Sequence, residues 1–179
     1  MVFPFLIGEK IYLRKLSEED AQGNYPGWLN DQIVCNNNSH AVFPYSRKEA
    51  LDYILNIHKN SESLVLAITL KNDDRHIGNI SLQCINNINR SAELAILIGE
   101  KDCWGKGYSK EAAKLIVSHG FNKMNLNRIC CGTSSKNFAM QKLAQFLGMK
   151  EEGNRRKALY LNGEYLDLIE YGLLKDDFC

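Results

Sequence analysis

The chain has 179 residues, of which 45% are hydrophobic and 24% are charged, a size and composition that suit one folded domain. Lysine and arginine total 22 against 21 aspartate and glutamate, so the formal net charge is +1 and a basic surface for nucleic acid is not expected. No stretch of about 18 apolar residues could span a membrane, and the apolar start meets Glu9 and Lys10 before a secretory signal could form. We therefore expect a single cytoplasmic domain over residues 1–179 that binds neither nucleic acid nor membrane.

The six cysteines contain no CxxC pair. Without a secretion signal we expect them to stay reduced and to act as small hydrophobic residues. Adjacent Cys130 and Cys131 would point to opposite faces of a strand. The sequence therefore predicts no disulfide framework and no metal site.

Read in chain order, the sequence alternates strand and helix patterns. Ser17 followed by three acidic residues predicts a helix start, and Pro26 should interrupt that helix. Ser46 with Glu49 three residues later has the capping-box arrangement of another helix. The expected elements are a strand at 10–16, a helix at 17–29, a loop at 35–45, a helix after Ser46, strands at 64–70, 76–85 and 92–98, a helix after Gly107, a strand at 128–133, a helix after Asn137, and strands at 150–161 and 164–174.

The links between these elements indicate how the strands pair. Short, turn-prone links at 72–75 and 86–90 favour an antiparallel meander of three strands. The helix after Gly107 and the strand that follows it make a β-α-β crossover, which predicts a parallel neighbour. Asn162-Gly163 is a strong signal for a two-residue hairpin turn.

Two closely spaced glycines, Gly105 and Gly107, stand between a strand pattern and a helix pattern. This geometry aims several backbone N–H groups at one anion, which we interpret as a pyrophosphate. An ATP-type loop needs four residues between its first glycine and Gly-Lys, but Gly99 and Gly105 enclose five. A dinucleotide fingerprint needs a third glycine where this chain has Lys110. Both of these spacings fail.

Residues 104–112 read WGKGYSKEA and resemble the acetyl-coenzyme A loop of the GCN5-related N-acetyltransferases (GNAT), especially their ribosomal-protein-alanine (RimJ/RimL-like) type. Residues 92–94 (AEL), 137–149 (NFAMQKLAQFLGM) and 162–174 (NGEYLDLIEYGLL) are also similar to that family. The order of elements agrees, so the resemblance covers essentially the whole chain. It implies the α+β GNAT fold, with a mixed, mostly antiparallel sheet of about seven strands, about four flanking helices and a β-α-β crossover around the acetyl-CoA loop.

The resemblance implies that acetyl-CoA is the co-substrate and that its acetyl group moves to a primary amine by direct attack in a ternary complex. Its pantetheine arm would pair with backbone at the end of the strand at 92–98, and its pyrophosphate would lie on the glycine loop. A simple turn with solvated lysines is the alternative for that loop, and Asn137 also has the pattern of a helix cap. The implied contacts to acetyl-CoA are Ile96, Leu97, Ile98, Gly99, Trp104, Gly105, Lys106, Gly107, Tyr108, Ser109 and Asn137.

Glu93 is the candidate general base. It lies in the run SAELAILIG at 91–99, which otherwise looks buried on both faces, and alternation places it with Ala95 and Leu97. An isolated carboxylate there is costly without a task or a partner. The alternative is a glutamate at a strand edge that pairs with Arg90 or another cation. The resemblance favours the catalytic role, because similar enzymes often carry a glutamate here that relays the amine proton through water.

The sequence departs from its relatives at the general acid. Many members place a tyrosine where this chain has Ala144, and the ribosomal type can use a serine where this chain has Met140. A thiolate leaving group, with a reference pKa near about 8.5, can depart largely unassisted. Solvent, or a tyrosine such as Tyr160 or Tyr165 from the last hairpin, could deliver the proton, and no residue is assigned to this role.

The acceptor side is implied by the same resemblance. Trp28, Asn38 and His40 lie in or beside the region that lines it in similar enzymes, although a lone histidine in an Asn-rich loop is more often a surface residue. The acceptor is expected to be a small amine such as an amino sugar, or a protein N-terminus, and a homodimer is compatible with the family. A non-catalytic acyl-CoA-binding sensor or structural protein is the alternative, because the usual acid is missing.

Overall fold

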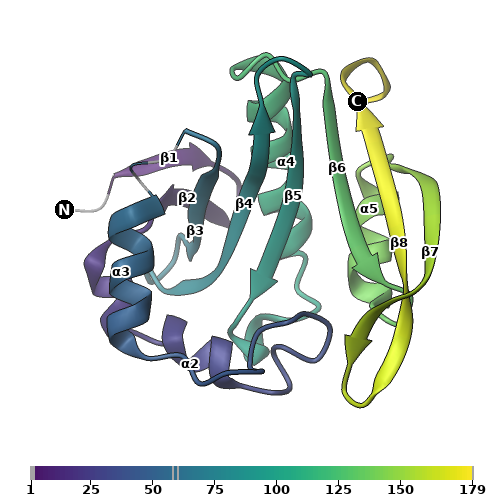
Figure 1. Cartoon of the computed structure of the whole chain (residues 1–179). Coiled ribbons are helices and arrows are strands. Elements are labelled where there is room, and N and C mark those ends of the chain that lie inside the picture. Colours follow the sequence, from purple (N-terminus) through teal and green to yellow (C-terminus); the bar gives the residue numbers. More distant parts are fainter. Residues whose placement is uncertain (1–2, 58, 60, 179) are drawn as a thin grey trace.

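The computed structural model describes residues 3–57, 59 and 61–178. Within them one eight-stranded sheet has the order β1-β2-β3-β4-β5-β6-β8-β7 (Figure 1). The strands are β1 (Pro4–Ile7), β2 (Ile11–Lys15), β3 (Leu64–Leu70), β4 (His76–Asn86), β5 (Ser91–Ile98), β6 (Arg128–Ser134), β7 (Lys150–Leu161) and β8 (Glu164–Leu174). The helices are α1 (Glu18–Gln22), α2 (Tyr25–Asn30), α3 (Arg47–Ile57), α4 (Tyr108–Asn122) and α5 (Phe138–Phe146), with short 3-10 turns at Lys101–Cys103 and Lys175–Asp177.

The expected α+β architecture is confirmed, with eight strands instead of about seven and five α-helices instead of about four in the described part of the chain. The extra strand is β1, which is short, mostly exposed and has no alternating pattern. The extra helix arises because Pro26 lies in the first turn of α2, where its missing N–H costs little. None of the helices in the described residues has the length and apolar character to cross a membrane. The five described cysteines are free thiols, and Cys179 lies outside the described residues.

Helices cover the two faces of the sheet unequally. In Figure 1, α2 and α3 lie in front of the part of the sheet nearest β1, and α4 and α5 lie behind the sheet. The alternation along β3 reflects these layers, because Val65 and Ala67 join a core with α1–α3 while Leu66 and Ile68 join the larger core with α4 and α5. Among the described residues, no helix covers the front of β5, β6 and β8.

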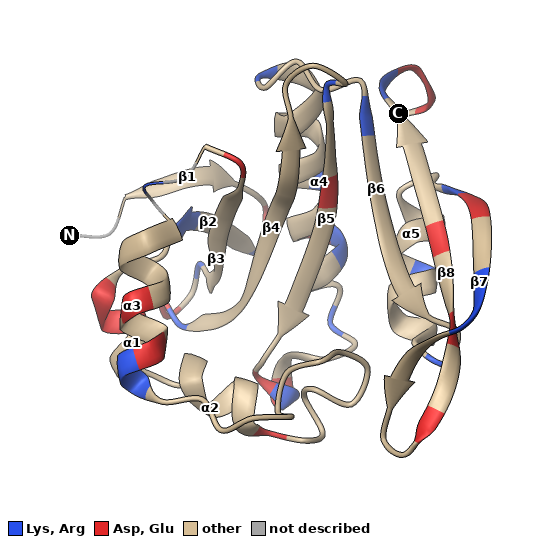
Figure 2. Cartoon of the chain, viewed as in Figure 1, with Lys and Arg blue, Asp and Glu red and all other residues tan. Residues whose placement is uncertain are grey.

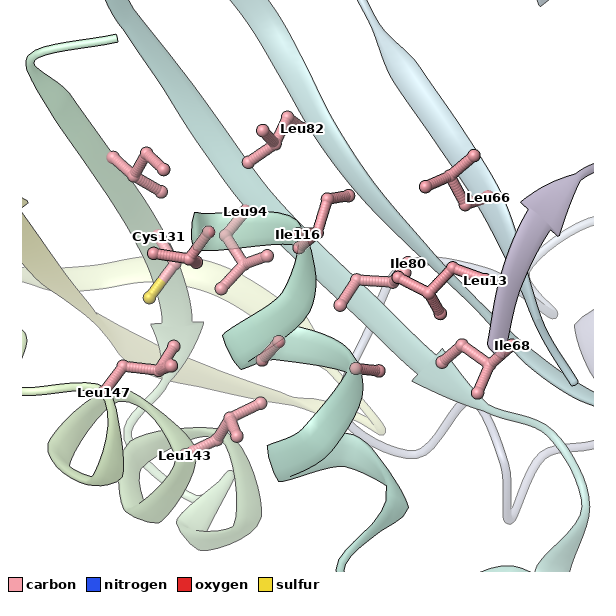
Figure 3. Close-up of a cluster of buried hydrophobic side chains, with 14 of the residues drawn as sticks. Leu13, Leu66, Ile68, Ile80, Leu82, Leu94, Ile116, Cys131, Leu143 and Leu147 are labelled. Carbon is pink, nitrogen blue, oxygen red and sulfur yellow. The ribbon is translucent and has the colours of Figure 1, made fainter. Parts of the chain in front are cut away.

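The larger core packs α4 and α5 against the back of the sheet. Figure 3 shows Ile116 of α4, Leu143 of α5 and Leu147 directly after α5 beside Leu82 and Leu94 of the sheet. All five are buried, and burying one such side chain contributes about 1.5–3 kcal/mol. These contacts hold the start of α4, and the glycine loop before it, at a defined place behind β4 and β5.

The sheet splits between β5 and β6. The expected antiparallel meander of β3, β4 and β5 and the parallel β5–β6 crossover are both confirmed. However, the parallel pairing covers only Ser91–Glu93 against Arg128–Cys130, whereas β5 runs on to Ile98 and β6 runs on to Ser134. The split is therefore narrow at Glu93 and wide at Ile98.

A buried charge cluster ties α1 to the sheet. Arg14 of β2 donates to both carboxylate oxygens of Asp20, at 2.7 Å each, and Nδ1 of His76 lies 3.0 Å from Asp20 Oδ1. The amide of Ser17 donates to the same carboxylate at 2.8 Å. Burial alone would raise the pKa of Asp20, but the hydrogen bonds from Arg14 and His76 outweigh burial and hold this pKa well below its ordinary value.

We expect this carboxylate to make the fold acid-sensitive. Because the pKa of Asp20 is lower in the folded than in the unfolded chain, its stabilisation is complete above the unfolded pKa of about 3.9 and is lost as the pH falls further. Asp20→Asn should lower the free energy of unfolding at neutral pH by about 3–5 kcal/mol, because Arg14 would stay buried beside a neutral partner. Urea unfolding across pH measures both effects. Asp52→Asn, on the exposed side of α3, is the control, and an equal loss in both variants would contradict the prediction.

Candidate active site

The split exposes backbone groups of β5. The amide of Gly99 donates to the carbonyl of Ile77 at 2.9 Å, and in an antiparallel pair such bonds recur at every second residue. Leu97 and Gly99 therefore bond to β4, while Ile96 and Ile98 direct their N–H and C=O groups into the split. Of the four predicted β5 contacts, these two can offer backbone groups to a ligand between β5 and β6.

Trp104 covers the wide end of the β5 edge with its side chain. Its Nε1 donates to the carbonyl of Ile98 at 2.8 Å, which confirms that this carbonyl points away from β4. The amide of Trp104 donates to the carbonyl of Lys101 at 3.2 Å. Trp104 therefore contributes a half-exposed indole beside this edge, and its amide, bonded to Lys101, is not among the free N–H groups of the turn.

The turn before α4 is shaped by two glycines in the left-handed region. Gly105 has a φ of 73° and Gly107 a φ of 87°, conformations that residues with a Cβ rarely adopt. α4 begins directly after Gly107, and the backbone amides of residues 105–109 donate to no residue that the structure describes. Lys106 is exposed on the same turn. Free N–H groups at the positive end of a 15-residue helix fit an anion, so the residues present suit the diphosphate of acetyl-CoA.

Glu93 lies where the split begins. It is the last β5 residue paired with β6, opposite Cys130, and its β4 neighbour is Gln83. Alternation along β5 puts it on the front face with Ala95 and Leu97, and Leu97 packs against the core that contains α1–α3. The expected burial of Glu93 is wrong, because this side chain is exposed where no described helix covers the front face.

The carboxylate of Glu93 has no hydrogen-bond or ion-pair partner within the described residues. Arg90, the alternative partner, donates instead to the carbonyl and the Oδ1 of Asn125, at 2.8 and 2.9 Å. Burial, and then the charge of Glu93, raise the pKa of the Cys130 thiol, so this neighbour stays protonated near neutral pH. Glu93 is thus an exposed carboxylate beside the protonated thiol of Cys130.

The front face around the split carries both signs of charge. Figure 2 shows acidic and basic segments interspersed along β6, β7 and β8. Arg128 pairs with Glu152, and Arg155 pairs with Glu170 at 2.9 Å. Because these carboxylates are neutralised by their partners, Glu93 differs from them in having no cation beside it in the described part of the chain.

Trp28 is buried below the front face, at 5% exposure. Its Nε1 donates to Glu100 Oε1 at 2.9 Å, and a Cβ on Gly99 would overlap its ring. Trp28 also lines a polar pocket of about 520 Å³ together with Asn24 and Lys101. Trp28 therefore holds the end of β5 against α2, and it would reach a ligand through this pocket.

Asn38 and His40 lie in the loop between α2 and α3. Asn38 Oδ1 accepts a hydrogen bond from the amide of His40 at 2.9 Å. Elsewhere in this loop, Asn36 accepts hydrogen bonds from the side chain of Asn162 at the tip of the β7–β8 hairpin. The loop thus lies beside the hairpin on the front side of the split (Figure 1). Sequence reasoning missed this contact because no local pattern relates residues 126 positions apart.

Asn137 is a helix cap whose side chain also has a free donor. Its Oδ1 accepts the amide of Met140 at 3.2 Å, whereas its Nδ2 donates to no described residue. Asn137→Ala should lower the free energy of unfolding by about 1 kcal/mol through the lost cap. It should also raise the KM for acetyl-CoA about threefold to tenfold through the lost donor.

Asn137→Ser separates these two roles of Asn137. Serine keeps a capping oxygen without the amide group, so we expect it to recover the thermal stability but not the KM. Thermal melts and steady-state kinetics on the same preparations measure both quantities. Recovery of the KM in the serine variant would limit Asn137 to capping.

Comparisons with known proteins give the family. Residues 10–150 match the model described as an acetyltransferase (GNAT) domain, so the chain belongs to the GNAT acetyltransferase family. It is 27% identical to the uncharacterized N-acetyltransferase p20 of Bacillus licheniformis, over 97% of this chain and 98% of that protein. Its fold is similar to that of spermidine N-acetyltransferase from Vibrio cholerae in complex with CoA and spermine, with a TM-score of 0.85 and 24% identity over 95% of this chain and 98% of that one. RimL, a ribosomal L7/L12 alpha-N-protein acetyltransferase solved with CoA, gives a TM-score of 0.84 and 18% identity over 94% of this chain and 96% of that one.

The chain is therefore an N-acetyltransferase whose co-substrate is acetyl-CoA. The two solved structures share its fold, and their names give different acceptors, a polyamine and a ribosomal protein. These comparisons thus give the family and the co-substrate, and they do not assign the chain to the RimJ/RimL-like type.

Proposed function

We propose that this chain transfers the acetyl group of acetyl-CoA to a primary amine by direct attack in a ternary complex, with Glu93 accepting the amine proton through water. The observation that carries the proposal is the split in the sheet. Unbonded amides of residues 105–109 lie at the start of α4, behind the sheet, and the unneutralised carboxylate of Glu93 faces the front. The two substrates would therefore meet between β5 and β6 from opposite faces.

When bound, acetyl-CoA supplies the thioester that the amine attacks. The amides of residues 105–109 bind its diphosphate, and the N–H of Ile96 or Ile98 donates to the oxygen on which negative charge develops. Because Glu93 is exposed, a water molecule can lie between its carboxylate and the amine. An α-amine, with a reference pKa of about 7.7–8.0, places a smaller demand on this base than a lysine amine at about 10.4.

We propose that the CoA thiolate leaves without a protein acid, since its reference pKa is about 8.5. Ala144 is buried in the core and carries no proton to donate, and the thioether of Met140 carries none either. Tyr160 and Tyr165 are exposed at the hairpin, with ring centroids 5.0 Å apart. Proton delivery by either tyrosine stays a prediction.

We propose a small amine or a protein N-terminus as the acceptor. The spermidine enzyme with the same fold supports the first class, and the ribosomal enzyme supports the second. The loop that holds Asn38 and His40 is rich in amides, which offer both donors and acceptors to either class. The RimJ/RimL-like type, one domain over residues 1–179, the cytoplasmic location and a homodimer stay predictions.

A free-thiol assay tests this proposed function. The purified chain is incubated with acetyl-CoA and with peptides, polyamines or amino sugars, and the release of CoA thiol is followed. We expect turnover with at least one class of amine. A non-catalytic acyl-CoA sensor would bind acetyl-CoA in calorimetry but release no thiol above the protein-free rate with any amine, and that result would overturn the proposal.

A further inference from the structure

The side chain of Glu111 joins the first turn of α4 to the sheet. Its Oε1 accepts hydrogen bonds from the amide of Lys10 at 2.9 Å and from the amide of Ile11 at 3.4 Å. These two residues lie at the start of β2, 101 and 100 positions away in the sequence. In the part of the chain that the structure describes, the two amides are the only partners of this carboxylate, and no other side chain of residues 105–111 hydrogen-bonds to the sheet.

The turn that receives Glu111 is itself held on the sheet. The carbonyl of Lys10 accepts the amide of Lys71 at 3.0 Å, and the amide of Gly8 donates to the carbonyl of Ile11 at 2.9 Å. Gly8 leaves room for the contact, because a Cβ at this position would overlap the carboxylate of Glu111. The turn between β1 and β2 is therefore a fixed point to which α4 is attached.

The backbone of Glu111 reaches the glycine loop. Its amide donates to the carbonyl of Gly107 at 3.2 Å, and the amide of Lys110 donates to the same carbonyl at 3.1 Å. Later residues of α4, such as Ile116, are buried against the sheet, but apolar contacts have no preferred direction. The hydrogen bonds of Glu111 are directional, so they fix where the first turn of α4 lies on the sheet.

A carboxylate is an unexpected group beside a site for a diphosphate. Negative charge near the start of a helix uses the same positive end that a bound anion would use, yet Glu111 lies in the first turn of α4, shortly after the unbonded amides of residues 105–109. Its attachment to β2 gives a physical reason for its presence. Amides bond more strongly to a charged acceptor than to a neutral one, and the carboxylate is directed to β2.

We propose that Glu111 is a positioning residue for acetyl-CoA, which holds the amides of residues 105–109 where they bind the diphosphate while its own carboxylate stays on β2. This inference rests on the proposed function of that loop. Without the attachment to β2, the first turn of α4 shifts over its apolar contacts and the amides no longer converge on one anion. The affinity for CoA therefore depends on the reach of this side chain more than on its charge.

Two variants separate reach from charge. Glu111→Gln keeps the length of the side chain and one oxygen that can accept both amides, because both hydrogen bonds go to Oε1. Glu111→Asp keeps the charge but is one methylene shorter, so its carboxylate does not reach the amide of Lys10. The matched control is Glu49→Asp, which shortens a carboxylate in the first turn of α3 that accepts the amide of Ser46 at 2.7 Å. In Figure 1, α3 lies in front of the sheet and α4 lies behind it.

We expect Glu111→Asp to raise the Kd for CoA about threefold to tenfold, the change that corresponds to losing about one hydrogen bond. Glu111→Gln should keep a Kd within about twofold of that of the unmodified chain, because it retains both contacts to β2. Glu49→Asp should lower the Tm without changing the Kd. Calorimetry with CoA and thermal melts on the same preparations measure both quantities for the unmodified chain and the three variants.

The result for each variant bears on the proposal. An unchanged Kd in Glu111→Asp, or an equal rise in both Glu111 variants, would overturn the inference. A rise of the same size in Glu49→Asp would overturn it too, because the effect would then follow general stability. An unchanged Kd in Gly107→Ala would instead contradict the proposed diphosphate site, and the inference with it, whereas a weakened Gly107→Ala beside an unchanged Glu111→Asp contradicts the inference alone.

Discussion

Glu93→Gln should lower kcat by about 10²- to 10⁴-fold at neutral pH and leave the Kd for CoA unchanged. Glutamine keeps the shape of the side chain but cannot accept the proton that the attacking amine must lose. Glu93 has no cation or hydrogen-bond donor beside it in the described residues, so its carboxylate is available as a base. The amides expected to bind CoA belong to residues 105–109 and do not touch this side chain.

The pH dependence adds a second signature to this variant. An amine deprotonates by itself above its own pKa, which is about 8 for an α-amine, so the deficit of Glu93→Gln should shrink as the pH rises through that value. Glu170→Gln is the control, because it removes the same charge from the same face while Glu170 is paired with Arg155 at 2.9 Å. The rate of thiol release is measured across pH for the unmodified chain, for Glu93→Gln and for Glu170→Gln. An equal loss of kcat in the two variants would show that the negative charge of the front face matters, and that Glu93 does not act as the base.

Gly107→Ala should weaken CoA binding about tenfold or more. Gly107 precedes α4 at a φ of 87°, and an alanine held in the left-handed region costs about 1–2 kcal/mol. The turn can relieve this strain by rotating, which would misdirect the amides of residues 105–109. A hydrogen bond to a charged group contributes about 1.5–3 kcal/mol, so misdirecting one of them accounts for the expected change.

Gly163→Ala separates loop strain from ligand binding. Gly163 has a φ of 86°, and a Cβ at either glycine would meet nothing within 4 Å. We therefore expect both variants to lose similar free energy of unfolding, while only Gly107→Ala changes the Kd for CoA in calorimetry. Equal Kd values for the two variants would remove the glycine loop from the CoA site.

Local patterns predicted most elements because their causes are local. Ser46 and Glu49 form the expected capping box, with the Ser46 amide 2.7 Å from Glu49 Oε2, and Asn137 caps α5. Asn162-Gly163 makes the expected hairpin turn. Each of these features depends on residues a few positions apart, so the local sequence is enough to predict them. The short strand β1 was not predicted, because its exposed residues follow no alternating pattern.

The exposure of Glu93 could not be predicted from its neighbours in the sequence. An apolar run such as SAELAILIG looks the same whether one face of the strand is covered or both are. Coverage depends on where helices from other parts of the chain pack, and α1–α3 leave the front of β5 open near Glu93. The same uncovered face leaves the side chain of Glu93 exposed.

The sequence by itself determined the order of the elements from β2 onward, apart from the division of the first helix, together with the glycine loop before α4, the resemblance to the acetyltransferases and the choice of Glu93 as the base to test. Tertiary structure alone decided that the sheet splits after Glu93, that Ile96 and Ile98 carry the backbone groups facing the split, and that Asn162 reaches Asn36 across it. The physical reason is the separation along the chain of the residues that interact. Turns, caps and glycine conformations are set by neighbours in the chain, whereas strand divergence and contacts over more than a hundred residues depend on how the whole sheet packs against its helices.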